Sequence, residues 1–114
     1  MKQERGHQAE QVVASWLAQQ GYELVAINWL HPRVEIDIVA QKADKLYVVE
    51  VKHRTSAREG FGDEYVDHKK QRQLEKACGY LVQSLQWSGE IGVVVVSTSG
   101  NTPVVDGIYE YYFD

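Results

Sequence analysis

Apolar residues near the start of the chain recur with the period of an α-helix. The i, i+3, i+4, i+7, i+8 spacing is carried by Ala9, Val12, Val13, Trp16 and Leu17. It predicts an amphipathic helix over about residues 4–20. Gly21 follows as its stop, since glycine is favoured just beyond a helix C-terminus.

Short runs rich in β-branched and apolar residues follow this helix and predict strands. Residues 22–28 form the first run, and residues 34–40 and 46–53 form a hairpin joined by residues 41–45. Residues 91–96, bounded by polar residues, predict a buried strand, and residues 104–113 a last strand region. The residues from Ser97 to Asn101 are interpreted as a turn.

A second helical period lies between the hairpin and the buried strand. It is carried by Leu74, Ala77, Cys78, Leu81, Val82 and Leu85. Asp67 is a candidate N-cap for this helix. The predicted order is therefore helix, three strands, helix, two strands, which is a mixed α/β arrangement over one domain, residues 1–114.

The composition is that of an ordinary globular protein. The 114 residues are 44% hydrophobic and 25% charged, which excludes a disordered, collagen-like or disulfide-rich chain. The lone Cys78 cannot form an internal disulfide and is expected in the core. No signal peptide is expected, and no apolar run approaches the roughly 18 residues of a membrane span. We therefore expect a cytoplasmic protein with no membrane partner.

The net charge of -4 hides an uneven distribution. Residues 42–76 hold nine Lys and Arg against seven Asp and Glu, and no Lys or Arg follows Lys76. A partner responds to the local field and not to the mean charge. The acidic total therefore does not exclude nucleic acid, although solvated faces alone also account for such a charge run.

The predicted hairpin carries the most informative polar residues. If its turn is centred near Ala43, Asp37 lies opposite Glu50 and Glu35 opposite Lys52, all on one face. The alternating residues Ile36, Ile38, Val49 and Val51 are apolar and predict a buried opposite face. Two carboxylates opposed across strands repel, so this arrangement needs a compensating positive charge.

Two interpretations of this polar face remain open. In one, Asp37 and Glu50 hold Mg²⁺ or Mn²⁺, with the Val51 carbonyl as a further oxygen ligand and Lys52 orienting water or neutralising phosphate charge. In the other, the face is solvated and carries a weak Glu35–Lys52 ion pair. The first interpretation predicts a metal-dependent phosphodiester hydrolase.

These residues resemble a known motif. Asp37 followed by Glu50-Val51-Lys52 is similar to the PD-(D/E)XK nuclease superfamily, and the chain resembles its YraN-like bacterial family, related to Holliday-junction resolvases. The resemblance also rests on Gly6, Ala9, Glu10, Arg54, Phe61-Gly62 and the run from Asp67 to Arg72. It implies a restriction-endonuclease-like αβββαβ core with a mixed central sheet flanked by helices.

The resemblance implies further site residues. Glu10 would reach the metal from the first helix, and Lys70 and Gln71 would stand near the site at the start of the second helix. Arg54 is a candidate phosphate contact, and DNA, including branched DNA, is the implied substrate. Val34 and Gly92 depart from the family pattern. The literal Pro of the motif name is also absent, because Ile36 precedes Asp37.

Three functions follow from these observations. The first is a Mg²⁺- or Mn²⁺-dependent DNA endonuclease, and the second is a nuclease-fold module that binds nucleic acid without turnover. The third is a partner-binding domain that forms a homodimer through the apolar, aromatic C-terminal strand. Tyr109, Tyr111 and Tyr112 of this strand are candidates either for stacking on nucleic-acid bases or for packing against another subunit.

Overall fold

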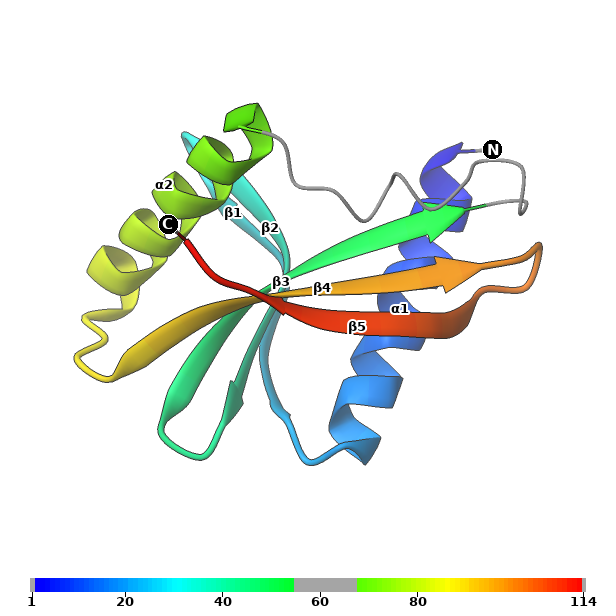
Figure 1. Cartoon of the computed structure of the whole chain (residues 1–114), viewed down its shortest axis with the longest axis horizontal. Helices are drawn as coiled ribbons and strands as arrows, with labels where there is room; N and C mark the ends of the chain where they lie inside the picture. Colours follow the sequence, from blue (N-terminus) through cyan, green and yellow to red (C-terminus); the bar gives the residue numbers. More distant parts are fainter. Residues whose placement is uncertain (1, 55–67, 114) are drawn as a thin grey trace.

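A computed structural model describes the backbone of residues 2–54 and 68–113 and their side chains from residue 7 onward (Figure 1). Helix α1 (Lys2–Gln19) precedes strands β1 (Glu23–His31), β2 (Val34–Lys42) and β3 (Lys45–Arg54), and helix α2 (His68–Leu85) precedes β4 (Glu90–Ser99) and β5 (Val104–Tyr111). The predicted order of elements is confirmed. Phe61, Gly62 and the candidate N-cap Asp67 lie outside the described residues.

The strands form one five-stranded sheet in the order β1-β2-β3-β4-β5. Strands β3 and β4 are parallel, and the other neighbours are antiparallel. A parallel pair needs a long crossover connection, and α2 lies in that connection between β3 and β4. The predicted α/β architecture with a mixed sheet is therefore confirmed.

Each face of the sheet carries one helix and one apolar cluster (Figure 1). The α1-side cluster consists of Val13, Ala14, Leu17, Ile38, Ala40, Tyr47, Val49, Val94 and Val96. The α2-side cluster consists of Ile36, Val39, Leu46, Val48, Leu74, Ala77, Cys78, Leu81 and Val93. Cys78 is a core residue, as predicted, whereas Ile36 and Ile38, expected on one face, lie in different clusters.

The β2–β3 hairpin has the predicted register. Lys42 pairs with Lys45 across a two-residue turn, and Ile38 pairs with Val49. Ala43 in that turn has a φ of 55°, the left-handed conformation that tight hairpins require. The turn is shorter than the five residues predicted, but it is centred where the sequence placed it.

The interpretation of Ser97 to Ser99 as a turn is wrong. Strand β4 continues to Ser99 and pairs with β5, although the pairing shifts between Ser97 and Thr98. Ser97 and Thr98 are buried, and their hydroxyls are hydrogen-bonded to Asp106 and His53. Short polar side chains favour turns by bonding local backbone, but here partners distant in sequence satisfy them.

Helix α1 ends as the sequence predicts. Gly21 has a φ of 93°, and the amides of Gly21 and Tyr22 donate to the carbonyls of Ala18 and Leu17. This is the capping pattern that glycine permits just beyond a helix. No helix in the described ranges is long and apolar enough to cross a membrane.

Candidate active site

Strands β2 and β3 stop pairing at the point where the predicted carboxylates lie. The last pair of this ladder is Ile38 with Val49, while β3 continues to pair with β4 as far as Arg54. Figure 1 shows the start of β2 and the end of β3 diverging from each other. Asp37 and Glu50 are the next residues on each strand. They therefore lie where β2 and β3 separate, a place that we call the fork.

Asp37 is the most strongly perturbed carboxyl group at this fork. Its Oδ2 accepts a 2.9 Å hydrogen bond from the main-chain amide of Val51. Burial raises the pKa of Asp37 to about 7, and the negative charges of Glu50 and Glu10 add to this effect. The Val51 bond and the Lys70 ammonium act in the opposite direction on this pKa without cancelling it. A positive charge at this position would therefore stabilise ionised Asp37.

Glu50 already has a cationic partner, which comes from helix α2. Lys70, in the first turn of α2, places Nζ 2.6 Å from Glu50 Oε1. Both side chains also line a cleft of about 240 Å³ between α2 and the start of β2, together with Arg33, Glu35 and others. The structure thus brings together Asp37, Glu50 and Lys70, all of them predicted site residues.

Glu10 of α1 acts electrostatically on the carboxylate at this fork. Burial raises the pKa of Glu10, while a hydrogen bond from the Asn28 side chain lowers it. Because Glu10 also raises the pKa of Asp37, the two carboxylates lie within electrostatic reach. Glu10 is half-buried on α1, so its charge is only partly screened by water.

Lys52 and Gln71 lie next to these groups in the chain. Lys52 is half-buried on β3, two residues after Glu50, and pairs with Ser97 of β4. The alternation of a strand places it on the same face as Glu50. Gln71 is half-buried beside Lys70 on α2. No Glu35–Lys52 ion pair forms within the ranges that the structure describes, so the alternative built on that pair lacks its contact.

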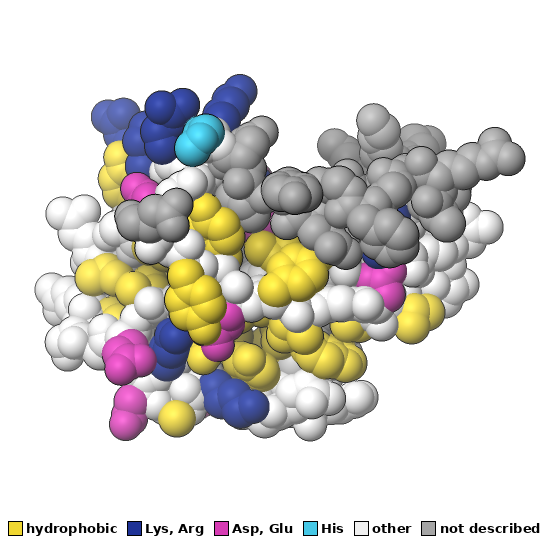
Figure 2. All heavy atoms as spheres, in the orientation of Figure 1, with side chains coloured by type: hydrophobic (Ala, Val, Ile, Leu, Met, Phe, Trp, Pro, Cys, Tyr) yellow, Lys and Arg dark blue, Asp and Glu magenta, His cyan; other side chains and the backbone are white. Residues whose placement is uncertain are grey.

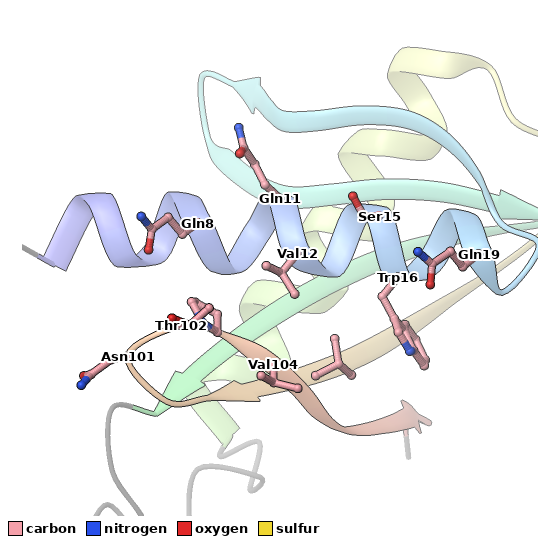
Figure 3. Close-up of a pocket in the computed structure, with 11 residues that line it drawn as sticks. Gln8, Gln11, Val12, Ser15, Trp16, Gln19, Asn101, Thr102 and Val104 are labelled. Carbon is pink, nitrogen blue, oxygen red and sulfur yellow. The ribbon is translucent and has the colours of Figure 1, made fainter.

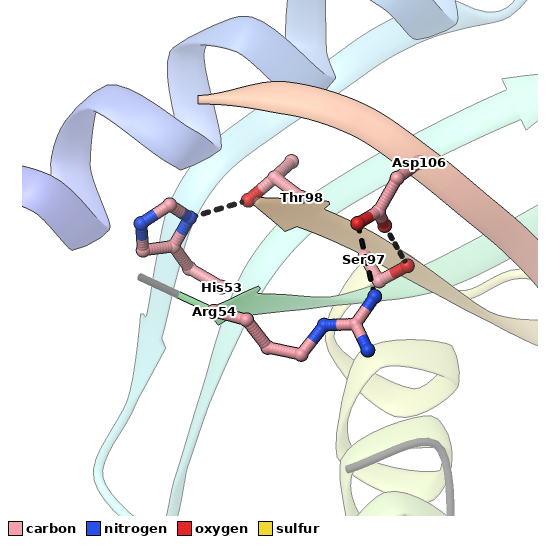
Figure 4. A network of polar contacts seen from close by, with 5 residues as sticks. All are labelled: His53, Arg54, Ser97, Thr98 and Asp106. Atoms are coloured by element: carbon pink, nitrogen blue, oxygen red, sulfur yellow. Dashed lines mark hydrogen bonds and ion pairs between the residues drawn. The ribbon is translucent and has the colours of Figure 1, made fainter. Parts of the chain in front are cut away.

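Arg54, a predicted phosphate contact, belongs to a polar network at the end of β3 (Figure 4). Its side chain is buried, and Nη2 donates to Asp106 Oδ2 at 2.9 Å. Ser97 Oγ lies 2.5 Å from the other Asp106 oxygen, and His53 Nδ1 lies 2.8 Å from Thr98 Oγ1. This geometry gives Arg54 a role in joining β3 to β5.

The oxygen donors at the fork suit a hard divalent cation. Among the described residues, no three His, Cys, Asp or Glu side chains converge to hold a metal ion. Mg²⁺, however, needs only one or two carboxylates and completes its shell with water and phosphate oxygens. Asp37 and Glu50 therefore match the donor set that Mg²⁺ uses at phosphate substrates.

A wide groove lies away from this fork. It measures about 860 Å³ and runs between α1 and the segment from Asn101 to Val105 (Figure 3). Its labelled side chains are neutral amides, a hydroxyl and apolar groups, with Trp16 and Gln19 at one end. This lining has no acid–base or metal-binding group, in contrast to the fork.

The sequence analysis missed two residues of these networks. Asn28 is an amide in the middle of β1 with a φ of 54°, and Asp106 is a bulged residue of β5 opposite the Ser97/Thr98 shift. Asparagine and aspartate are rare inside strands. An asparagine and an aspartate inside predicted strands were therefore the signal that could have pointed to these two residues.

The sequence is similar to those of bacterial proteins of one family. The model of the uncharacterised protein family UPF0102 matches residues 9–96. A UPF0102 protein of Porphyromonas gingivalis is 42% identical over an alignment of 83 residues, and the match covers 70% of this chain but only 59% of that protein. UPF0102 proteins of Cytophaga hutchinsonii and Chromohalobacter salexigens are 31% and 36% identical over 85% and 87% of this chain, and over 86% and 80% of their own lengths.

Proposed function

The chain belongs to the uncharacterised protein family UPF0102, and from this premise we propose that it is a metal-dependent endonuclease that hydrolyses phosphodiester bonds in DNA. The observation that carries the proposal is the meeting of Asp37 and Glu50 at the β2–β3 fork. Lys52 follows on the same strand. The motif that the sequence resembles requires this juxtaposition, and the restriction-endonuclease-like arrangement of the core is part of the same proposal.

In this proposal Asp37, Glu50 and the Val51 carbonyl would hold Mg²⁺ or Mn²⁺. Within an extended strand, the N–H and C=O groups of one residue point to the same side. The Val51 amide faces Asp37, so its carbonyl is directed toward the same edge. Glu10 supports the site from α1. The bound cation would acidify water and withdraw charge from the phosphate.

The remaining residues act on the substrate. Water attacks phosphorus, one P–O ester bond breaks, and the leaving oxygen takes up a proton. The Lys52 ammonium orients the water or neutralises the charge that develops on the phosphate oxygens. Lys70 and Gln71 lie where the DNA backbone would approach Glu50.

The distribution of charge supports a polyanionic partner. Lys and Arg side chains gather over the N-terminal part of α2 (Figure 2). Four basic residues lie within one stretch of this helix, at Lys69, Lys70, Arg72 and Lys76. Such a cluster predicts DNA binding that weakens steeply with salt.

One observation favours a second candidate, a DNA-binding module without turnover. The Lys70 ammonium already neutralises Glu50 at 2.6 Å, in the role that a metal would otherwise have. A chain that uses Lys70 permanently in this way would bind DNA but would not take up Mn²⁺.

The deciding experiment incubates the full chain with duplex, single-stranded and four-way-junction DNA in Mg²⁺ or Mn²⁺. We expect cleavage that EDTA, Asp37→Asn and Glu50→Gln each abolish, while the exposed Glu23→Gln cleaves like wild type. Salt-sensitive binding with no product and no Mn²⁺ uptake would establish the second candidate instead. Equal cleavage by wild type and Asp37→Asn would overturn the site.

A further inference from the structure

Strand β1 contains one residue in a conformation that strands normally exclude. Asn28 has a φ of 54° although it lies inside the strand Glu23–His31. Among residues other than glycine, asparagine tolerates this left-handed region best. The β1–β2 register is regular on either side, with Ile27 opposite Ile38 and Trp29 opposite Ile36. Asn28 therefore lies across from Asp37, at a rung where the two are not paired.

The alternation of side chains breaks at this rung in both strands. Residues three apart in a regular strand face opposite sides of the sheet. Yet Ala26 and Trp29 both pack against the α2-side cluster, and Ile36 and Val39 both belong to it. The side chains of Asn28 and Asp37 are therefore not bound to the alternation that their neighbours follow. They can contact groups on either helix.

We propose that Asn28 is a positioning residue whose carboxamide holds the Glu10 carboxylate toward Asp37 and the metal site. This inference rests on the proposed function. The left-handed backbone of Asn28 lies across from Asp37, hydrogen bonding from its side chain lowers the pKa of Glu10, and the charge of Glu10 raises the pKa of Asp37. Strained backbone inside a strand persists where surrounding structure demands it, and such strain gathers at functional sites.

Asparagine is the residue that combines both requirements at this position. Glycine would accept the left-handed backbone but has no side-chain donor. Serine or glutamine would supply a donor without tolerating the backbone as well. Aspartate would accept the backbone but would oppose Glu10 with a second carboxylate.

The first test measures Mn²⁺ binding to the full chain by calorimetry. Asn28→Gly keeps the backbone conformation and removes the carboxamide, so the protein should fold and bind Mn²⁺ five- to tenfold more weakly. The control Gln86→Gly changes another left-handed residue, with a φ of 52°, at the end of α2 and should bind like wild type. In a Glu10→Gln background, Asn28→Gly should cause no further loss. An unchanged affinity, or the same loss in both backgrounds, would overturn the proposal.

The second test needs no metal. In the metal-free full chain, Glu10→Gln should shift the side-chain NH₂ signals of Asn28 in a ¹⁵N-resolved NMR spectrum, whereas Glu23→Gln should not. Signals that ignore Glu10→Gln would overturn the positioning role. If wild type takes up no Mn²⁺ at all, the proposed function fails, and this spectrum still decides whether Asn28 orients Glu10.

Discussion

The main-chain amide of Val51 donates a 2.9 Å hydrogen bond to the Asp37 carboxylate, and this bond joins two strands beyond their last paired residues. The Asp37 carboxylate therefore accepts the hydrogen bond that a backbone carbonyl of β2 would accept if the ladder continued. This places one Asp37 oxygen on β3 and leaves the group among the charges of Glu10, Glu50 and Lys70. The carboxylates thus gather at the place where the ladder between β2 and β3 ends.

The first prediction concerns stability against pH in the metal-free protein. Burial and Glu50 raise the pKa of Asp37 from 3.8 to about 7. Between these values the folded chain keeps a proton that the unfolded chain has released. The free energy of unfolding should therefore fall as pH rises from about 4 to 7, by up to about 4 kcal/mol from this group.

Asp37→Asn should remove this dependence. We expect the variant to gain about 2 to 4 kcal/mol over wild type at pH 8 in EDTA, and little at pH 4. Urea unfolding at both pH values measures the difference, with Glu23→Gln as the exposed control. Parallel pH profiles for wild type and Asp37→Asn would contradict the prediction.

The second prediction concerns the Lys70–Glu50 ion pair. Its ammonium competes with a metal for Glu50 Oε1, which lies 2.6 Å from Lys70 Nζ. Lys70→Met should therefore tighten Mn²⁺ binding about three- to tenfold in the absence of DNA, a change of about 1 kcal/mol. Lys69→Met makes the same charge change at the exposed neighbouring position.

Calorimetric titration of both variants separates a local effect from a general one. Equal tightening in Lys70→Met and Lys69→Met would show that only the net charge matters. DNA affinity should fall in both variants, because each removes one phosphate contact from the basic stretch of α2.

The sequence predicted the hairpin part of this site because its information is local. A turn near Ala43 and alternating apolar residues set the β2–β3 register, and that register brings Asp37 beside Glu50. The contacts of Lys70 and of Asn28 join residues that are far apart in the chain. They depend on how α1 and α2 pack on opposite faces of the sheet, which no local pattern reports.

The third prediction concerns Arg54. Its guanidinium is buried and paired with Asp106 at 2.9 Å, and Asp106 also holds Ser97. Arg54→Ala should lower the free energy of unfolding by about 1 to 3 kcal/mol, because it leaves these partners unsatisfied. Thermal and urea unfolding measure this loss.

A double-mutant cycle with Asp106→Ala identifies the cause. The two substitutions should couple by about 1 kcal/mol or more if they act through one ion pair. Burial acts to raise the pKa of Asp106, but hydrogen bonds from Ser97, Ser99 and Arg54 together outweigh it and lower this pKa. The stability from this carboxylate should therefore be present above pH 4 and be lost as pH falls further. If the stability losses of the two single substitutions simply add, Arg54 does not stabilise the fold through its pair with Asp106.

The last prediction separates chemistry from binding at Lys52. Its ammonium is assigned to the phosphate and the attacking water, whereas Asp37 and Glu50 are assigned to the metal. Lys52→Ala should therefore lower kcat for DNA cleavage by about 10²- to 10³-fold. Its Mn²⁺ affinity should stay within about threefold of wild type and its stability within about 0.5 kcal/mol. Single-turnover kinetics with excess enzyme measure the first effect, and calorimetry and urea unfolding the others.

The control for Lys52 is Lys42→Ala, which removes an exposed lysine near the hairpin turn and should cleave like wild type. A loss confined to KM in Lys52→Ala would make Lys52 a DNA-binding residue and not a catalytic one. Wild-type cleavage by Lys52→Ala together with no cleavage by Asp37→Asn would retain the metal site and remove Lys52 from the chemistry. The separation is decisive because β3 places Glu50 and Lys52 two residues apart on one face, where a loss of metal and a loss of the ammonium would otherwise reduce cleavage alike.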